Sequence, residues 1–335
     1  MNRTRTEYGG FLPLELNEGR EFYLYDETQM QRFNCGKAAV ASVMQYIAPK
    51  TIYIPYYLCP NVCKEIESHN LKVEYYHIDE KMMPVDLPDE EGDCVYLVNY
   101  FGIMDVAITQ YARSFQKAFV ILDNSHSFYC KPIMSKNIYN IYSCKKFFGV
   151  PDGAYLISAH LEGGEIAEGY ASERALYLFE SLEQGTNYCY TKKKEADFEI
   201  ARNYEGMSVL AKRILQSIDY EAVKKKRCDN FRQYEEAFAE MNLFECAENS
   251  VPYIYPLNVG RNIKKQLVEK KIYVPTLWGH MIEEKFKGSL EYRLSDETIF
   301  LPLDQRYHYN DIEYIIETVK YILTETGSSK MKRWV

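Results

Sequence analysis

The stretch Phe119-Val120-Ile121-Leu122-Asp123-Asn124-Ser125-His126 joins an apolar run to polar residues, and it decides the fold class of this 335-residue chain. A short apolar run bounded by polar residues is typical of a buried strand. A second such run, residues 138–142, leads into Ser143-Cys144-Lys145-Lys146. Polar residues that follow parallel strands meet in the crevice at the carboxyl ends of the sheet. We therefore expect Asp123, Ser143 and one of the two lysines to share a site.

A carboxylate, a hydroxyl and an amine in this order suit pyridoxal phosphate (PLP). The carboxylate can keep a pyridine nitrogen protonated, a lysine can form a Schiff base, and a serine hydroxyl can bind the phosphate. Lys146 is favoured by the turn Val150-Pro151-Asp152-Gly153 behind it, which leads into another apolar strand. Each residue also has a structural interpretation: Asp123 as a turn or N-cap residue, and Lys146 as a surface lysine.

Three other segments hold candidate binding residues. Asn34-Cys35-Gly36-Lys37-Ala38-Ala39 opens a predicted helix, whose N-terminus offers N–H groups to a phosphate, although an ordinary N-cap is the alternative. His126 is a candidate for contact with the phenolic oxygen or the ring of the cofactor, or is a hydrogen-bonded structural histidine. Tyr56 and Tyr57 follow a short strand, so they either flank a ring or a sugar or pack in the core.

Strand and helix signals alternate in the first half of the chain, which predicts a mostly parallel sheet covered on both faces. The strands are predicted at residues 51–54, 71–76, 94–99, 119–122, 138–142 and 154–158, and the helices at 35–47, 60–69 and 109–117. Mainly helical segments are predicted at 165–183 and 205–239, followed by strands at 251–257 and 272–274 and helices at 260–270 and 310–323. We predict an α/β fold with a large domain over residues 1–235 and a smaller C-terminal α/β domain over 236–335.

Composition argues against several classes of protein. The net charge is −8, and acidic residues flank the short basic runs at 192–194 and 224–227, so we expect no nucleic-acid partner. The nine cysteines lack the spacing of a metal site, and we expect no metal. With no signal peptide evident, these cysteines favour reduced thiols in the cytoplasm. No run approaches the roughly 20 apolar residues that span a membrane, so we expect no membrane partner.

Taken together, these segments give the chain a resemblance to the fold-type I PLP enzymes, and among them to the DegT/DnrJ/StrS sugar aminotransferases. The order of motifs carries the resemblance. Residues 34–39 are similar to the family's Ser-Gly-Thr-Ala-Ala phosphate turn, and residues 122–127 to its Glu-Asp-Ala-Ala-Gln-Ala segment. Residues 143–154 resemble the segment that carries the Schiff-base lysine and ends in Gly-Glu-Gly-Gly, which makes Lys146 the match. Weaker likenesses cover residues 52–57, 98–102 and 300–303.

The resemblance implies a PLP-dependent aminotransferase that acts on a nucleotide-linked keto-sugar, in the biosynthesis of surface polysaccharides or amino sugars. It also implies glutamate as the amino donor. Lys146 would carry the cofactor, Asp123 would hold the ring nitrogen protonated, and His126 stands where the family has Gln.

The same resemblance assigns the remaining cofactor-binding residues. Gly36, Lys37 and Ser143 would bind the phosphate, and Tyr57 would lie beside the ring. Asn187, in Gly185-Thr186-Asn187-Tyr188, would reach the phosphate of the neighbouring subunit in a homodimer.

Three departures from the family pattern keep other functions open. Lys37 replaces a Thr of the phosphate turn, Cys59 stands where the stacking aromatic is expected, and the spacing from Ser143 to Lys146 is short. A degenerate, non-catalytic member that binds a sugar nucleotide or a partner protein is one alternative. Another PLP reaction, such as sugar dehydration, is the second. A lysine at position 146 disfavours the dehydratase branch, in which the resemblance places a His.

Overall fold

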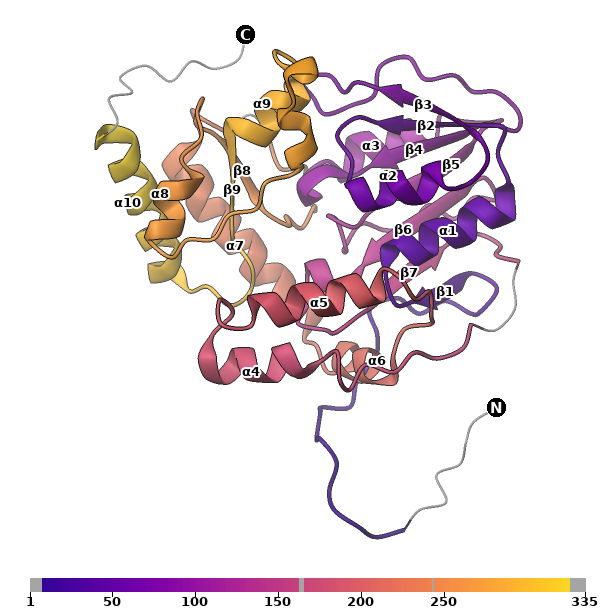
Figure 1. Ribbon diagram of the computed structural model, residues 1–335, viewed down its shortest axis with the longest axis horizontal. Helices are drawn as coiled ribbons and strands as arrows, with labels where there is room; N and C mark the ends of the chain where they lie inside the picture. The colour runs from indigo at the N-terminus through magenta and orange to yellow at the C-terminus, as the bar shows by residue number, and fades with distance from the viewer. Residues whose placement is uncertain (1–7, 163–165, 243, 326–335) are drawn as a thin grey trace.

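A seven-stranded sheet forms the centre of the computed structural model, which describes residues 8–162, 166–242 and 244–325 (Figure 1). The strand order is β1-β7-β6-β5-β4-β2-β3. The strands are β1 Met30–Phe33, β2 Thr51–Pro55, β3 Lys72–Tyr76, β4 Cys94–Val98, β5 Phe119–Asp123, β6 Ile138–Ser143 and β7 Ala154–Ile157. Neighbours from β3 to β6 run parallel, whereas β7 runs antiparallel to both β6 and β1. The mostly parallel sheet expected from the sequence is therefore confirmed.

Alternate residues of the central strands enter two different cores, because successive side chains of a strand point to opposite faces. In β4, Val95 and Leu97 belong to the cluster that contains Ile108 of α3 (Asp105–Ala112). Tyr96 and Val98 belong instead to the cluster that includes α1 (Gly36–Ile47) and α2 (Pro60–Glu67). Helices thus cover both faces, and the apolar runs of β4 and β5 are buried on each side.

Polar residues follow the strands at one end of the sheet, as parallel strands require. Asp123 is the last residue of β5, and its neighbour across β4 is Val98. Ser143 ends β6 and pairs with Ala154 of β7. Lys146 ends the short 3-10 helix η2 (Cys144–Lys146), which starts the connection from β6 to β7.

A smaller unit lies beside this edge of the sheet (Figure 1). It contains the antiparallel pair β8 (Tyr255–Asn258) and β9 (Thr298–Leu301). Its helices are α7 Tyr220–Phe238, α8 Lys264–Glu269, α9 Leu290–Asp296 and α10 Tyr309–Glu325. Because α7 packs against both α10 and β8, it is part of this unit's core. The predicted domain boundary after residue 235 lies within the last turn of α7 and stays a prediction.

Several elements differ from the sequence predictions. The helix expected at 109–117 is α3, which begins at Asp105 and ends at Ala112, because Asp105 supplies the acidic first turn. In the segment predicted as helix at 165–183, the described residues are helical only in α4 (Leu176–Gln184). No strand forms at residues 272–274 of the described chain, and the strand predicted at 251–257 is β8, shifted to 255–258.

Among the strands and α-helices of the described residues, β1, β9, α5 (Tyr190–Ile200) and α9 were not predicted. The helix α5 contains Lys192-Lys193-Lys194 and has no strong apolar face, so its periodicity is weak. Among the described residues no helix has the length and apolar character that crossing a bilayer requires, and no cluster of three or more His, Cys, Asp or Glu forms a metal site.

Candidate active site

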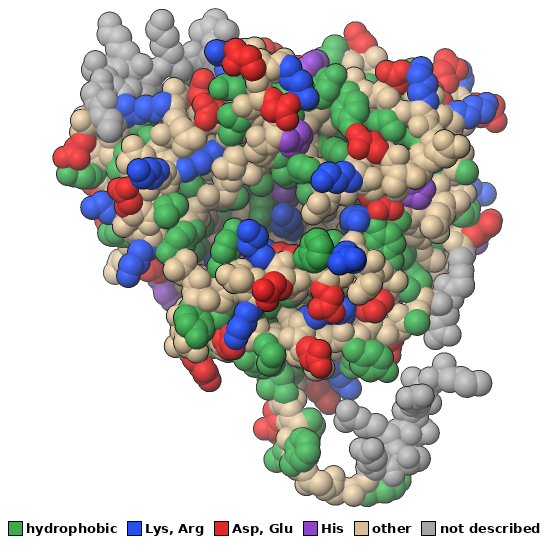
Figure 2. All heavy atoms as spheres, viewed as in Figure 1, with side chains coloured by type: hydrophobic (Ala, Val, Ile, Leu, Met, Phe, Trp, Pro, Cys, Tyr) green, Lys and Arg blue, Asp and Glu red, His purple; other side chains and the backbone are tan. Residues whose placement is uncertain are grey.

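Lys145 and Lys146 are directed to different surroundings. The Lys145 amine pairs with Asp197 of α5, with 2.6 Å between Nζ and Oδ1. The Lys146 amine lies above the ring of Tyr253, with Nζ 5.7 Å from the ring centroid. Lys146 is closely surrounded by protein, yet its side chain remains exposed to solvent, which places it in a concave part of the surface. Figure 2 shows a hollow at the centre of one face of the molecule.

The turn that carries Lys146 is held in shape by Gly153. The Cys144 N–H donates to the Gly153 carbonyl over 3.0 Å. Gly153 has φ +129°, and an added Cβ would lie 3.2 Å from the Cys144 side chain. Only glycine therefore fits this turn without strain. The sequence Asp152-Gly153 thus sets the direction in which η2 presents Lys146.

Asp123 is buried at the end of β5 and is held by two donors. Its Oδ2 accepts a hydrogen bond from the Tyr96 hydroxyl over 2.8 Å, and its Oδ1 accepts one from the Ser125 N–H over 2.8 Å. The Asp123 charge contributes to raising the pKa of Lys146, after the larger effect of Tyr253, so the carboxylate and the amine belong to one site. A carboxylate has about four lone-pair sites, so Asp123 retains capacity for a further donor.

His126 lies among parallel aromatic rings. Its ring is 4.7 Å from that of Tyr253 at an interplanar angle of 14°, and 5.9 Å from that of Trp278 at 8°. Burial, and next the positive charge of Lys146, hold the pKa of His126 well below 6.5, so the imidazole is neutral. Its buried Nδ1 has no hydrogen-bond partner in the described part of the chain. His126 is therefore an open hydrogen-bonding group beside Lys146.

The first turn of α1 lies against the residues that follow Asp123. A Cβ added to Gly36 would lie 3.7 Å from the Ser125 hydroxyl. The N-cap residue Cys35 makes no side-chain capping hydrogen bond, and the first N–H groups of a helix have no acceptor within the helix itself. The Lys37 side chain, however, points away: its amine donates to the Ala201 carbonyl over 3.0 Å and pairs with Glu65 over 3.5 Å.

The remaining predicted residues occupy three different places. Ser143 is half-buried at the end of β6, three residues before Lys146. Tyr57 is fully buried, and its ring meets the edge of Trp278 at 4.7 Å. Asn187 lies in an exposed turn between α4 and α5. The structure thus brings Lys146, Asp123 and His126 together, sets Gly36 close to the Asp123 turn, and leaves Asn187 on the surface.

Comparison with known proteins gives structural neighbours only: no family model and no curated protein matches the sequence. The sugar aminotransferase CalS13 from Micromonospora echinospora superposes with a TM-score of 0.56 and 13% identity, over 87% of each chain. Spr1654 from Streptococcus pneumoniae in its PLP form gives 0.58 and 14%, over 89% of this chain and 88% of that one. A DegT DnrJ EryC1 StrS aminotransferase from Brucella abortus gives 0.58 and 14%, over 88% and 85%.

The chain has the fold of these aminotransferases. The expected fold-type I scaffold, with its large sheet domain and a smaller C-terminal α/β unit, is thereby confirmed over most of the chain. At 13–14% identity the comparison establishes the fold, and the chemistry has to be argued from the residues of the site.

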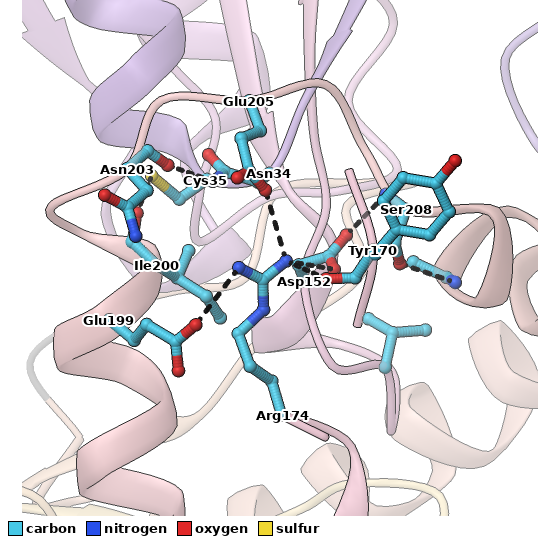
Figure 3. A network of polar contacts seen from close by, with 12 residues as sticks. Asn34, Cys35, Asp152, Tyr170, Arg174, Glu199, Ile200, Asn203, Glu205 and Ser208 are labelled. Atoms are coloured by element: carbon cyan, nitrogen blue, oxygen red, sulfur yellow. Dashed lines mark hydrogen bonds and ion pairs between the residues drawn. The ribbon is translucent and has the colours of Figure 1, made fainter. Parts of the chain in front are cut away.

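A buried polar network behind the site was missed from the sequence (Figure 3). Arg174 lies within 3.9 Å of the Asp152 carboxylate and 3.4 Å of the Glu205 carboxylate. Asp152 in turn accepts a hydrogen bond from the Ser208 N–H. This network fixes the segment around residues 170–208 of the fold-type I scaffold against the turn that carries Lys146. No sequence signal links Arg174 to Asp152, because the pair is formed only by the tertiary fold.

Three further site residues also escaped prediction: Tyr96, Tyr253 and Trp278. Tyr96 lies in an apolar run, where a tyrosine reads as core, although it donates to Asp123. Tyr253 and Trp278 lie C-terminal to α7, and their rings reach His126, which follows β5 of the large sheet. The excess of tyrosines in the sequence, 31 in all, was the only hint of such contacts.

Proposed function

We propose that this protein is a PLP-dependent aminotransferase that acts on a nucleotide-linked keto-sugar. The observation that carries the proposal is the arrangement of Lys146, whose side chain is exposed to solvent just beyond the carboxyl end of β6 and lies close enough to Asp123 for that carboxylate to raise the pKa of its amine. The neighbouring Lys145 is engaged by Asp197 and is unsuited to the role. The fold supports the proposal, since Spr1654, which shares it, has a PLP form.

The residues around Lys146 fit the cofactor in three respects. Asp123 is a firmly held carboxylate for the ring nitrogen, and the unpartnered His126 Nδ1 suits an oxygen on the ring. The Gly36 turn, with the first N–H groups and the positive end of the α1 dipole, suits the phosphate, together with Ser143. We assign the Lys37 contribution to its backbone N–H, because its amine is used elsewhere.

Bound PLP would supply a protonated ring that accepts electrons when a proton leaves the substrate. Lys146 would bond covalently to the cofactor at rest. When freed, its Nζ would take a proton from the substrate carbon and later return it, as general base and then acid. Because nearby groups raise the pKa of Lys146, its free amine is protonated at neutral pH and must lose a proton before it bonds to the cofactor.

The proposed sugar substrate is supported by the shared fold and by the motif resemblance. CalS13, which has the same fold, is a sugar aminotransferase. The nucleotide linkage, glutamate as donor, and a role in surface polysaccharide or amino-sugar biosynthesis follow from the motif resemblance. All nine cysteines are free thiols, which supports the proposal that the protein works in the reducing cytoplasm.

We also propose a homodimer in which Asn187 contributes to the neighbouring subunit's site. The helices that flank Asn187 expose a set of large apolar side chains, and such a set marks an interaction surface more often than a free one. On α4 these are Leu176, Phe179 and Leu182, and on the turn and α5 they are Tyr188, Tyr190 and Phe198. We call these six residues the α4–α5 surface.

The proposal is tested by the visible absorbance of the purified protein after PLP is added and unbound cofactor is removed. We expect a yellow protein whose long-wavelength band is bleached by glutamate and restored by a 2-keto acid. Lys146→Ala should lose the band that depends on the covalent bond, and Lys145→Ala should keep it. A protein that retains no cofactor would favour the degenerate, non-catalytic alternative, and cofactor retention without bleaching by any amino donor would favour a different PLP reaction.

A further inference from the structure

Lys146 and Tyr253 come from different units of the fold, and the Lys146 amine lies over the face of the Tyr253 ring. The Lys146 Nζ lies 5.7 Å from the centroid of the Tyr253 ring, within the range in which a cation is attracted to an aromatic face. The Tyr253 ring is also stacked on the His126 ring, with 4.7 Å between the centroids. Neither the proposed reaction nor the motif resemblance gives Tyr253 a role.

Tyr253 is fixed at its backbone as well as at its ring. Its N–H donates to the Phe101 carbonyl over 2.8 Å. Its carbonyl accepts a hydrogen bond from Nη1 of Arg227 over 3.1 Å. A residue held at its N–H, its carbonyl and its ring has little freedom to turn, so its ring presents one defined face to the hollow.

Arg227 also holds the chain next to Lys146. Its Nη2 donates to the Phe147 carbonyl over 3.4 Å, and its guanidinium carbon lies 4.4 Å from the Phe147 ring centroid. The Arg227 side chain is only 1% exposed, and its Nε donates to Gln305 over 3.2 Å. One buried guanidinium on α7 therefore joins the two backbone segments whose side chains meet in the hollow.

We infer that Tyr253 is a positioning residue for Lys146, whose ammonium it holds over its ring, and that Arg227 fixes the distance between the two segments. Lys146 is then kept in the middle of the hollow, instead of turning toward the acidic side chains around it. The value of this position for catalysis rests on the proposed function of Lys146, but the position itself is a property of the protein alone.

The electrostatic surroundings of Lys146 place Tyr253 close to its amine. Coulombic attraction to the Tyr253 phenol oxygen, which is distinct from the ring face, makes the largest contribution to raising the pKa of Lys146; burial opposes it, and Cys59 and nearby acidic groups add to the increase. Besides Tyr253, the titratable groups that act on Lys146 include Cys59, Asp123 and Asp197, and Lys146 in turn acts on His126.

The inference is tested on cofactor-free protein by competitive labelling with acetic anhydride, which acylates only unprotonated amines. Mass spectrometry would follow Lys146 and Lys145 separately from pH 7.5 to pH 11. At high pH the labelling rate of Lys146 reaches a plateau, because all of the amine is then unprotonated. Below that pH, Tyr253→Leu should raise the rate about three- to tenfold, because the ammonium loses the ring that stabilises it and a larger fraction of the amine is unprotonated. The rate for Lys145, which pairs with Asp197, should not change.

Tyr253→Phe separates the ring from the hydroxyl. Because the ring face is kept, the Lys146 rate should lie between those of the wild type and Tyr253→Leu. Equal rates in the wild type and the Leu variant would overturn the inference. Equal rates in the Phe and Leu variants would also overturn the inference. A rise in the Lys146 labelling rate that is the same at every pH, including the plateau, would overturn it too, since greater access of the reagent to the amine would produce such a rise.

A second set of variants tests whether Arg227 fixes the distance between the segments that carry Lys146 and Tyr253. Arg227→Met should raise the Lys146 labelling rate below the plateau, although neither Lys146 nor Tyr253 is changed. Arg232→Met, on an exposed part of the same helix, removes an arginine whose ion pair is with Asp229, far from the Lys146 turn in the sequence, and serves as the control. If Arg227→Met destabilises the protein, Arg227→Lys, which keeps the charge but loses the fork of donors, replaces it. A folded Arg227 variant with wild-type Lys146 labelling would overturn this step.

Labelling does not require that PLP binds. A chain that fails to retain the cofactor but shows the expected Tyr253 effect would refute the proposed function and leave the positioning inference standing. A yellow, active protein without the Tyr253 effect would do the reverse.

Discussion

The Asp152 carboxylate accepts a hydrogen bond from the backbone N–H of Ser208, with 2.9 Å between Oδ1 and N, and so joins the Lys146 turn to the start of α6 (Val209–Gln216). Ser208 is the N-cap of this helix, and its hydroxyl accepts a hydrogen bond from the Ala211 N–H. Desolvation by burial raises the pKa of Asp152, which makes its charge costly in spite of the nearby Arg174. The hydrogen bond and the charge of Asp152 therefore contribute differently to stability.

Two substitutions at Asp152 separate these contributions. Asp152→Asn keeps the acceptor for the Ser208 N–H and removes the buried charge, so the free energy of unfolding should change by less than about 1 kcal/mol at pH 7.5. Asp152→Ala leaves a buried N–H without a partner and should cost roughly 1–3 kcal/mol. Urea unfolding measures both values. Equal losses in the two variants would contradict the assignment.

Asp123 should matter through its charge. In Asp123→Asn the side-chain volume is kept and local pairing with Tyr96 or Ser125 remains possible, so the protein should fold. The amide cannot hold a ring nitrogen protonated, and the barrier to transamination should rise by several kcal/mol, comparable to the roughly 2.7–4 kcal/mol for loss of one oxyanion donor. The measurement is kcat/KM on the true substrate, with the melting temperature as a folding control. Near-normal turnover would return Asp123 to the role of a turn residue.

His126 should make the protein sensitive to acid. Its pKa in the folded protein lies well below 6.5, so the unfolded chain takes up a proton that the folded protein does not. The stability that depends on neutral His126 is therefore present above pH 6.5 and is lost progressively as the pH falls below it.

The pH dependence is measured by urea unfolding of His126→Gln at pH 7.5 and pH 5. This variant should lose less stability on acidification than the wild type, whereas His308→Gln, at an exposed position, should behave as the wild type does. If His126→Gln showed the wild-type loss on acidification, another group would have to be the acid-sensitive one.

The α4–α5 surface should hold the dimer together. Leu182 is 86% exposed in the single chain, so a charge at this position is harmless to folding unless a partner covers it. Leu182→Glu should shift the sedimentation coefficient from dimer to monomer at micromolar concentration, with cofactor bound. Val106→Glu, on an exposed part of α3, should remain dimeric. A wild-type protein that sediments as a monomer would refute the proposed homodimer.

The parts of the fold that the sequence predicts well are those whose pattern is local. The runs that became β4, β5 and β6 are apolar because both faces of each strand are covered, and the polar residues after them mark the carboxyl edge. In contrast, β1 is a four-residue strand that forms only because β7 offers it an antiparallel edge. The periodicity of α5 is too weak to detect without its tertiary contacts.

The candidate site divides in the same way. The places of Asp123 at the end of β5 and of Lys146 just after β6 could be predicted from the local pattern, whereas their roles stay predictions. Tyr253, Trp278 and Arg227 could not be predicted, since they lie far away in the sequence and reach the hollow only when the smaller unit packs against the sheet. The sequence also could not predict that the Lys37 side chain points toward Ala201 and Glu65, because this direction depends on where residues 200–205 pass the start of α1.

Borohydride reduction of the PLP-loaded protein would show whether Lys146 bonds to the cofactor. Reduction fixes the bond between the amine and the cofactor, and peptide mass mapping then locates the pyridoxyl group. We predict a single labelled residue, Lys146, with Lys145 in the same peptide unmodified. A pyridoxyl group on Lys145, or a loaded protein with no labelled lysine after reduction, would contradict the account.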